Sequence, residues 1–498
     1  MTHEVIAQAA QGRLRGARDE DALRFLGIPY AESPATAGRF SAPRPHPSWD
    51  GVRDALSYGA TSPQPDRGVT LIPEPIVPGD NELNLNVFTP DLSGTLPVLV
   101  WIHGGGYFGG CNASPWYRGG PFARDGVVLV SINYRLGASG FLELPDAPAN
   151  RAVRDWILAL EWVQENIGAF GGDPSRVTIA GQSAGGGACA ALLGAPAARG
   201  LFRGAICMSG GSELSHTPDG VQRVTEAMAA QLGVSPTKAA FEALPPAAII
   251  AAQEALMAKS MGAMGGAKDK ETVIAALGSG VSLPFAPWAD GTVITSSPLS
   301  AAASRSDVSL LVGATANEFN MAWLANDWVT ADMVREGLTK AGVPAASVEA
   351  YLDLPGRPCD IVGQALTDRT FRAPAQHLAA VAGGPAWVYD FRWSSADGAI
   401  PGQAFHCLDV PFAFDNLHEP GVREAAGGNP PPDLATAMHG AWVRFVASGD
   451  PGWAPYTTAP AATGSAATAA RSTMLFAESS ETRPDPLSTE RRAWPADQ

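Results

Sequence analysis

One serine stands in a context typical of a catalytic nucleophile. Residues 181–185 read Gly-Gln-Ser-Ala-Gly, an apolar run over residues 176–180 precedes them, and small residues typical of a packed helix follow. A strand that turns tightly into a helix, with glycines beside the serine, lifts the hydroxyl of Ser183 above the sheet, where a base can reach it. The same turn directs the backbone N–H of Ala184 toward a developing oxyanion. The alternative is a serine N-cap on a glycine-rich helix.

A glycine loop is the second candidate element. Residues 103–106 read His-Gly-Gly-Gly and follow directly on an apolar run over residues 96–102, which is predicted to be a strand. Consecutive glycines leave bare backbone N–H groups that can approach a substrate oxygen closely. We interpret His103 itself as a packed, hydrogen-bonded loop residue rather than a base or metal ligand. A plain glycine turn is the alternative.

A serine nucleophile requires a base and a carboxylate that orients the base, because a neutral hydroxyl is a poor nucleophile near pH 7. When the serine lies on such a strand–turn–helix, the order along the chain is serine, acid, histidine. Glu318 and His406 both follow predicted strands and fit this order. Asp290 competes with Glu318, and His418 competes with His406. Order and placement alone leave both alternatives open.

The elements around these residues predict an α/β fold. Short apolar runs alternate with longer helical stretches, a pattern that indicates a mainly parallel sheet with helices on both faces. Alanine-rich stretches over residues 221–277 and 329–354 are predicted to be helices inserted around that sheet. No linker divides the chain, so residues 1–498 are predicted to form one elaborated domain. The predicted strands span residues 96–102, 127–134, 176–180, 204–209, 309–315 and 387–393.

Composition excludes several function classes. The chain has 498 residues, of which 46% are hydrophobic and 17% charged, and is therefore expected to bury a large core. Its net charge of −15 has the wrong sign for binding nucleic acid or anionic lipid. No apolar run reaches the roughly 18 residues of a membrane span. Metal, nucleotide and dinucleotide motifs are absent from the sequence, so no metal and no cofactor is expected.

The cysteines and the first residues bear on location. Five cysteines form an odd number without C-x-x-C spacing and lie mostly in apolar runs. We interpret them as reduced, buried thiols. The first residues form no basic and apolar leader, so no secretory signal is expected. Together these observations predict a cytoplasmic protein.

The order of the motifs resembles the type-B carboxylesterase and cholinesterase family, above all its bacterial para-nitrobenzyl-esterase-like members. The resemblance runs over nearly the whole chain and is carried by residues 25–31, 133–135, 170–174, 181–186 and 449–451. It implies the α/β-hydrolase fold and a serine esterase that hydrolyses small-molecule carboxylic esters without a cofactor. It also implies the site residues, with Ser183 as nucleophile, His406 as general base, Glu318 as the orienting acid, and the N–H groups of Gly105, Gly106 and Ala184 as oxyanion donors.

The substrate pocket is less well defined by sequence. Aromatic residues near the predicted site loops suggest an apolar, aryl-accepting pocket. The resemblance aligns residues 283–288 and Met321 loosely with the walls of the acyl pocket, and places Asp409 and Ser209 near the triad. The candidate pocket residues are Tyr107, Phe108, Leu283, Trp288, Phe319 and Met321.

Three departures from the family pattern are visible. Ser62 and Glu82 occupy two positions at which secreted relatives carry a disulfide, which supports a reducing compartment. Gln182 replaces the glutamate of many relatives and removes a negative charge beside the nucleophile, so cationic choline esters are not favoured. Phe319 replaces a glycine after the acid and is expected to narrow or reshape the pocket.

Two other functions remain open at this stage. A carbamate or amide hydrolase would use the same three catalytic residues. A catalytically silent binding protein is the alternative from another class, because the family also contains adhesion proteins that lack the triad. Retention of Ser183, Glu318, His406 and the glycine loop argues against that alternative.

Overall fold

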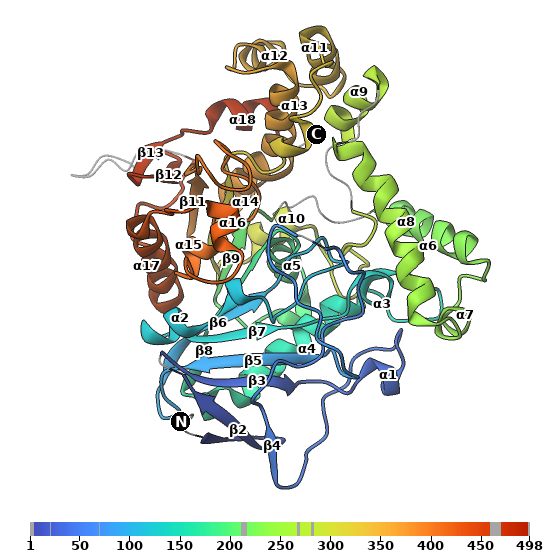
Figure 1. Cartoon of the computed structure of the whole chain (residues 1–498), viewed down its shortest axis with the longest axis vertical. Helices are drawn as coiled ribbons and strands as arrows, with labels where there is room; N and C mark the ends of the chain where they lie inside the picture. The colour runs from blue at the N-terminus through green and yellow to red at the C-terminus, as the bar shows by residue number, and fades with distance from the viewer. Residues whose placement is uncertain are drawn as a thin grey trace.

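The computed structural model describes residues 4–19, 21–68, 70–210, 217–265, 269–279, 283–458 and 470–496. In this part of the chain, a 13-stranded sheet runs through the molecule in the order β1-β2-β3-β5-β7-β6-β8-β9-β10-β11-β12-β13, with β4 beside β2 (Figure 1). The strands are β1 (Glu4–Ala9), β2 (Gly12–Arg18), β3 (Leu23–Pro29), β4 (Val52–Asp54), β5 (Asn84–Thr89), β6 (Leu96–Ile102), β7 (Val128–Ile132), β8 (Gly172–Gln182), β9 (Gly204–Met208), β10 (Ser309–Thr315), β11 (Ala386–Phe391), β12 (Ser472–Phe476) and β13 (Glu481–Pro484).

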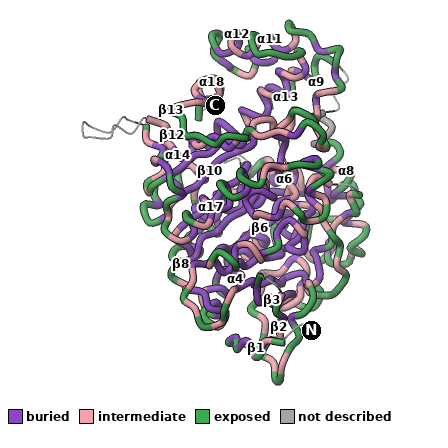
Figure 2. The backbone as a smooth tube through the Cα atoms, turned by 60° about the vertical axis from the view of Figure 1, so that its left-hand side comes forward, coloured by how far each residue is buried: buried purple, intermediate pink, exposed green. Residues whose placement is uncertain are grey.

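The middle of the sheet is parallel, and its ends are antiparallel. Every neighbouring pair from β7 through β6 and β8 to β12 is parallel. Antiparallel pairs form the β1-β2-β3-β5-β7 end and the β12–β13 end. Buried backbone gathers along the central strands (Figure 2), and β5, β7, β9 and β11 are buried at every residue. The predicted mainly parallel sheet is confirmed.

All six predicted strands are present. In most of them the observed ends differ from the predicted ends by a few residues. The strands predicted over residues 96–102 and 309–315 have the bounds of β6 and β10. The antiparallel strands at the sheet ends were not predicted from apolar runs. The outer strands β1 and β13 are half and fully exposed, and in the buried strands β3 and β5 the polar residues Arg24 and Asn86 interrupt the apolar residues.

Helices cover both faces of the sheet because successive strand residues point to opposite sides. Val100 of β6 packs in one buried cluster with side chains of α4 (Arg151–Asn166), α5 (Ala184–Leu193), α10 (Pro298–Ser304) and α14 (Ala373–Val381). Its neighbour Trp101 packs in a second cluster with α2 (Gly120–Arg124), α15 (Val410–Ala413), α16 (Val422–Ala426) and α17 (Pro432–Ser448).

The alanine-rich stretches form helical insertions at the right and top of the molecule in Figure 1. The first stretch is divided rather than continuous: Gly233, with φ of 65°, ends one helix, and Pro246 begins another. A third buried cluster joins helices of both stretches. The insertions comprise α6 (Pro218–Leu232), α7 (Lys238–Glu242), α8 (Pro246–Gly265), α9 (Lys270–Ser279), α11 (Ala331–Lys340), α12 (Ala345–Leu352) and α13 (Pro358–Thr367), and α18 (Ser488–Ala493) packs beside them.

All five cysteines carry free, buried thiols. The two positions that correspond to a disulfide in secreted relatives have different contacts here. The Ser62 hydroxyl donates to the carbonyl of Tyr134, and burial raises the pKa of Glu82 to about 7. Among the described residues, no helix is both long and apolar enough to cross a membrane.

A buried ion pair fixes α4 beneath the sheet, and its loss is expected to destabilise the protein. Arg135 donates to both carboxylate oxygens of Asp155, at 2.9 and 2.6 Å, and the two side chains are 1% and 0% exposed. Asp155→Ala leaves a buried guanidinium without its counter-charge. We expect the free energy of unfolding, measured by urea denaturation, to fall by about 3 to 5 kcal/mol.

The matched control for this prediction is Glu349→Ala, which removes the exposed pair between Arg335 and Glu349. Solvent screens such pairs, so the control is expected to keep the wild-type denaturation midpoint. Equal midpoints for the Asp155 variant and the wild type would contradict the assignment of the buried pair to stability.

Candidate active site

The turn between β8 and α5 holds Ser183 in a strained conformation. Its φ and ψ are 57° and −123°, and its N–H donates to the carbonyl of Met208 at 2.8 Å. Close packing of the backbone requires glycine at both Gly181 and Gly185. A Cβ atom on Gly185 would lie 2.0 Å from the carbonyl oxygen of Ile102, and one on Gly181 would lie 2.4 Å from the backbone of Gly185. Strain of this kind persists where the surrounding structure imposes it, and it is concentrated at functional sites.

The glycine loop lies directly against this turn. A Cβ atom on Gly104 would be 3.3 Å from that of Ser183, and Gly105 and Gly106 have φ of 104° and 63°. The glycine loop and Ser183 are therefore direct neighbours. His103 is a packed residue, as interpreted from sequence. Its ring stacks on the ring of Tyr134 with 4.5 Å between the ring centres, and burial lowers the pKa of His103 to about 4.

The side chains of Glu318 and His406 contact each other. Oε2 of Glu318 contacts Nδ1 of His406, and the two groups are joined a second time by a 3.0 Å hydrogen bond from the N–H of His406 to the carbonyl of Glu318. The other carboxylate oxygen, Oε1, accepts from the N–H of Thr315 at 2.7 Å. Both side chains are buried. One oxygen of the Glu318 carboxylate is thus held by a backbone N–H, and the other faces the imidazole of His406.

The competing residues lie elsewhere. Asp290 caps a turn by accepting from three backbone N–H groups at 2.7 to 3.0 Å. His418 lines a separate cavity that is bordered by Arg118 and Glu419. The geometry therefore pairs Glu318 with His406, which order along the chain could not decide.

Ser183 and His406 line one cavity of about 330 Å³. No hydrogen bond joins the hydroxyl of Ser183 to His406 among the described residues; Nε2 of His406 lies 3.3 Å from the side-chain amide of Gln182. Contacts between catalytic groups commonly shorten when substrate binds. The remaining lining residues are Arg67, Thr70, Leu71, Ile72, Glu74, Gly105, Gly106, Phe108, Tyr117, Gln182, Leu283, Phe319, Phe371 and Cys407.

Three of the predicted pocket residues do not line this cavity. Tyr107 is fully buried and packs against Phe141 and Trp156. Trp288 is held by backbone hydrogen bonds to the side chain of Asn150, and Met321 packs against the cluster that contains Trp101. Position near a site loop did not reveal where each side chain points, because neighbouring residues of a turn face different directions.

Several cavity residues were missed by sequence reasoning. Arg67 and Glu74 form an ion pair, and the Arg67 guanidinium lies 5.0 Å from the ring centre of Phe108. Phe371 lies on a π-helix (Asp368–Arg372) and packs 5.3 Å from the ring of His406. No local pattern marks these residues, since they reach the site only through tertiary packing.

Comparisons with known proteins show the family of this chain. Residues 3–463 match the sequence profile of the Carboxylesterase family. The chain belongs to the carboxylesterase family. It is 34% identical over 470 residues to para-nitrobenzyl esterase of Bacillus subtilis (strain 168), covering 91% of each chain, and 35% identical over 469 residues to phenmedipham hydrolase of Pseudarthrobacter oxydans, covering 90% of each.

A solved structure of the Geobacillus stearothermophilus carboxylesterase EST55 is similar with a TM-score of 0.82, 31% identity, and coverage of 98% of this chain and 99% of that one. The protein therefore has the α/β-hydrolase fold and is a carboxylic ester hydrolase of the serine esterase type. The resemblance derived from sequence motifs is confirmed at the level of the family.

The surroundings of His406 set its proton affinity in this carboxylesterase. Burial disfavours the imidazolium, whereas the carboxylate of Glu318 favours it, and the pKa of His406 is raised above its usual 6.5. Burial also raises the pKa of the Cys407 thiol, which therefore stays neutral and donates to Oε1 of Gln182 at 3.3 Å. Asp409 lies nearby, and burial raises its pKa to about 7.

Proposed function

We propose that Ser183, His406 and Glu318 hydrolyse esters through a covalent acyl-enzyme. His406 takes the proton of the Ser183 hydroxyl as the oxygen attacks the ester carbonyl, and the same proton is passed to the departing alcohol. Water then attacks the acyl-enzyme with His406 again as base, which releases the acid and restores the serine. Glu318 holds the imidazole with Nδ1 protonated. The observation that carries this proposal is the contact between Glu318 and His406 at the cavity that Ser183 lines.

The oxyanion is assigned to the backbone N–H groups of Gly105, Gly106 and Ala184. Gly105 and Gly106 both line the cavity. Ala184 is the first residue of α5, where free N–H groups point outward. Each donor is expected to contribute about 3 to 4 kcal/mol of transition-state stabilisation, as similar donors do in other serine hydrolases.

Labelling with a fluorophosphonate probe tests the proposal directly, because only an activated serine reacts. We expect one modified residue, Ser183, identified by peptide mass spectrometry. Absence of labelling in the folded protein would favour the non-catalytic binding protein. The folded state is checked by far-UV circular dichroism on the same sample.

The cavity favours esters with apolar or aryl groups. Four aromatic side chains and three aliphatic ones line the cavity together with Ser183: Phe108, Tyr117, Phe319, Phe371, Leu71, Ile72 and Leu283. A second candidate substrate class is the carbamates. The Arg67–Glu74 pair places hydrogen-bond donors and an acceptor in the same cavity, which suits a carbamate N–H and carbonyl, and one similar protein is named a phenmedipham hydrolase.

Kinetics on a matched series separates these classes. The series comprises p-nitrophenyl esters of graded acyl length and p-nitrophenyl N-phenylcarbamates. Every substrate in it therefore releases the same leaving group, p-nitrophenol. We expect kcat to be highest for the esters, because slow release of the carbamoyl group limits the kcat of the carbamates. Faster steady-state turnover of carbamates would assign the second class instead.

The whole chain, residues 1–498, is proposed to form one catalytic unit in the cytoplasm. The five free thiols support a reducing compartment. Its net charge of −15 supports the expectation that neither nucleic acid nor an anionic membrane is a partner.

The pH dependence of activity follows from the proton affinity of His406. The imidazole must be neutral to accept the proton of Ser183, and its pKa lies above 6.5. Activity is therefore retained above that pKa and is lost as the pH falls through it. We expect the acid limb of kcat/KM for p-nitrophenyl butyrate to have its midpoint above 6.5. A profile that stays flat down to about pH 5 would exclude His406 as the base.

A further inference from the structure

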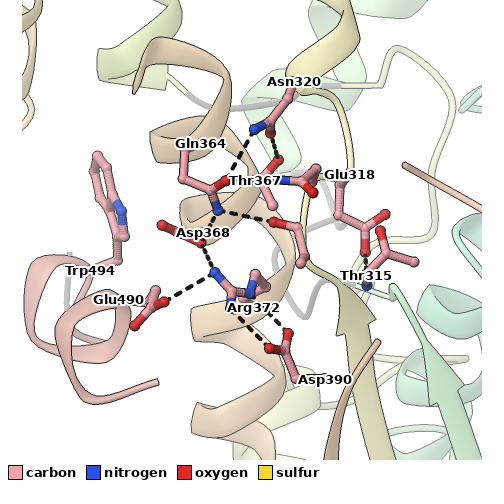
Figure 3. A network of polar contacts seen from close by, with 12 residues as sticks. Thr315, Glu318, Asn320, Gln364, Thr367, Asp368, Arg372, Asp390, Glu490 and Trp494 are labelled. Atoms are coloured by element: carbon pink, nitrogen blue, oxygen red, sulfur yellow. Dashed lines mark hydrogen bonds and ion pairs between the residues drawn. The ribbon is translucent and has the colours of Figure 1, made fainter. Parts of the chain in front are cut away.

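Two side chains of α13, Gln364 and Thr367, bond the loop that carries Glu318, and Gln364 makes most of these contacts. Figure 3 shows this loop beside α13, whose polar residues face it. Nε2 of Gln364 donates to the carbonyl of Ala316 at 3.1 Å, and Oε1 accepts from the side-chain amides of Asn317 at 3.1 Å and Asn320 at 3.0 Å. The loop is therefore tied to α13 on both sides of the catalytic acid.

The same contacts reach the segment that carries His406. The N–H of Asn317 donates to the carbonyl of Ala404 at 2.9 Å, and the N–H of Ala404 donates back to Oδ1 of Asn317 at 3.1 Å. Because Gln364 holds the amide of Asn317, it constrains how the loops of Glu318 and His406 meet.

Gln364 is itself held in orientation by buried charges. Its Nε2 also donates to Oδ1 of Asp368 at 2.9 Å, and Asp368 is paired with Arg372 at 2.7 Å. Arg372 in turn pairs with Asp390 of β11 and Glu490 of α18, both at 3.0 Å (Figure 3). The π-helix that carries Asp368 and Arg372 is a form of local backbone often found at functional sites. These contacts therefore hold the side chain of Gln364 in one orientation.

Gln364 does not touch the substrate cavity. It lines a different cavity of about 730 Å³ on the other side of the loop, together with Asn317, Asn320 and Arg372. An effect of Gln364 on the reaction must therefore pass through the loop that it holds, or through the π-helix that carries Asp368 and Phe371.

We propose that Gln364 is a positioning residue of the esterase, which sets the orientation of the Glu318 carboxylate toward Nδ1 of His406. The proposal rests on the proposed function, in which Glu318 orients the base. Catalytic groups must be held within about 0.5 Å of their productive geometry, and small misplacements caused by distant substitutions reduce rate by about 100-fold.

Gln364→Met is the test variant, because methionine has similar length and volume but makes none of the four hydrogen bonds. We expect kcat for p-nitrophenyl butyrate to fall by about 10- to 100-fold with KM within about 2-fold of the wild type. Ile361→Val is the matched control. Ile361 lies on the same helix and lines the same cavity, but makes only apolar contacts there, and this variant is expected to keep the wild-type kcat.

A double-mutant cycle with Glu318→Gln separates positioning from general loosening of the fold. If Gln364 acts through Glu318, then Gln364→Met is expected to lower kcat by less than about 3-fold in the Glu318→Gln background. An equal loss in both backgrounds, or no loss in the single variant, overturns the proposal. Wild-type activity of Glu318→Gln itself would instead overturn the proposed role of the acid.

Gln364→Glu keeps the proposal testable if the methionine variant does not fold. A glutamate retains both acceptor contacts but cannot donate to Ala316 or Asp368. The new carboxylate oxygen faces the carboxylate of Asp368 and the carbonyl of Ala316, so we expect a loss of kcat with the same dependence on Glu318. A loss that does not depend on Glu318 overturns the proposal for this variant as well.

Discussion

Replacing Ser183 with alanine is expected to reduce kcat/KM for p-nitrophenyl butyrate by roughly 10⁵- to 10⁶-fold, the range reached when the serine nucleophile of other hydrolases is removed. The variant keeps the glycine loop, and with it the oxyanion donors, so a slow reaction with water remains. Alanine fits the turn sterically as well as serine does, although both are strained at φ of 57°. The fold and the thermal midpoint are therefore expected to be retained.

The matched control is Ser304→Ala, on the exposed end of α10, which is expected to keep wild-type turnover and wild-type labelling by fluorophosphonate. Labelling of the Ser183 variant at wild-type stoichiometry would identify a different nucleophile. Turnover by that variant within about 10-fold of the wild type would lead to the same conclusion.

Glu318→Gln is expected to lower kcat by roughly 10³- to 10⁴-fold, as the loss of the corresponding carboxylate does in another serine hydrolase. One oxygen of Glu318 accepts from the N–H of Thr315, so a glutamine keeps its oxygen there and turns its NH₂ toward Nδ1 of His406. Nδ1 must then accept, which moves the imidazole proton to Nε2. A histidine with that tautomer cannot take the proton of Ser183.

The same variant changes the pH profile in a defined direction. The carboxylate of Glu318 is one of the contacts that raise the pKa of His406, so its removal lowers that pKa and moves the acid limb to lower pH. Asp409→Asn is the control, because Asp409 lies near Glu318 but is bonded to the hydroxyl of Tyr389 rather than to the imidazole. We expect its kcat to fall by less than about 10-fold. An acid limb that stays in place in Glu318→Gln would contradict the assigned partner.

Some features of the protein follow from sequence because they depend on local interactions. The turn at Ser183 requires glycines within two residues of it, and the buried central strands require continuous apolar runs. The family motifs also predicted a nucleophile, the glycine loop and the order of the acid and base. Residue types at fixed short spacings carry this information, since the sterics and hydrogen bonds that they satisfy lie within one or two turns of backbone.

The tertiary structure shows which distant groups meet. Order along the chain left Asp290 and Glu318 equivalent, the family resemblance implied Glu318, and the approach of the loops that follow β10 and β11 brings Glu318 into contact with His406. The cavity walls at Arg67, Glu74 and Phe371, and the loop contacts of Gln364, likewise join segments far apart in sequence. Their positions depend on how helices and loops pack against the finished sheet, and the direction of each side chain is set by that packing and not by its immediate neighbours in the chain.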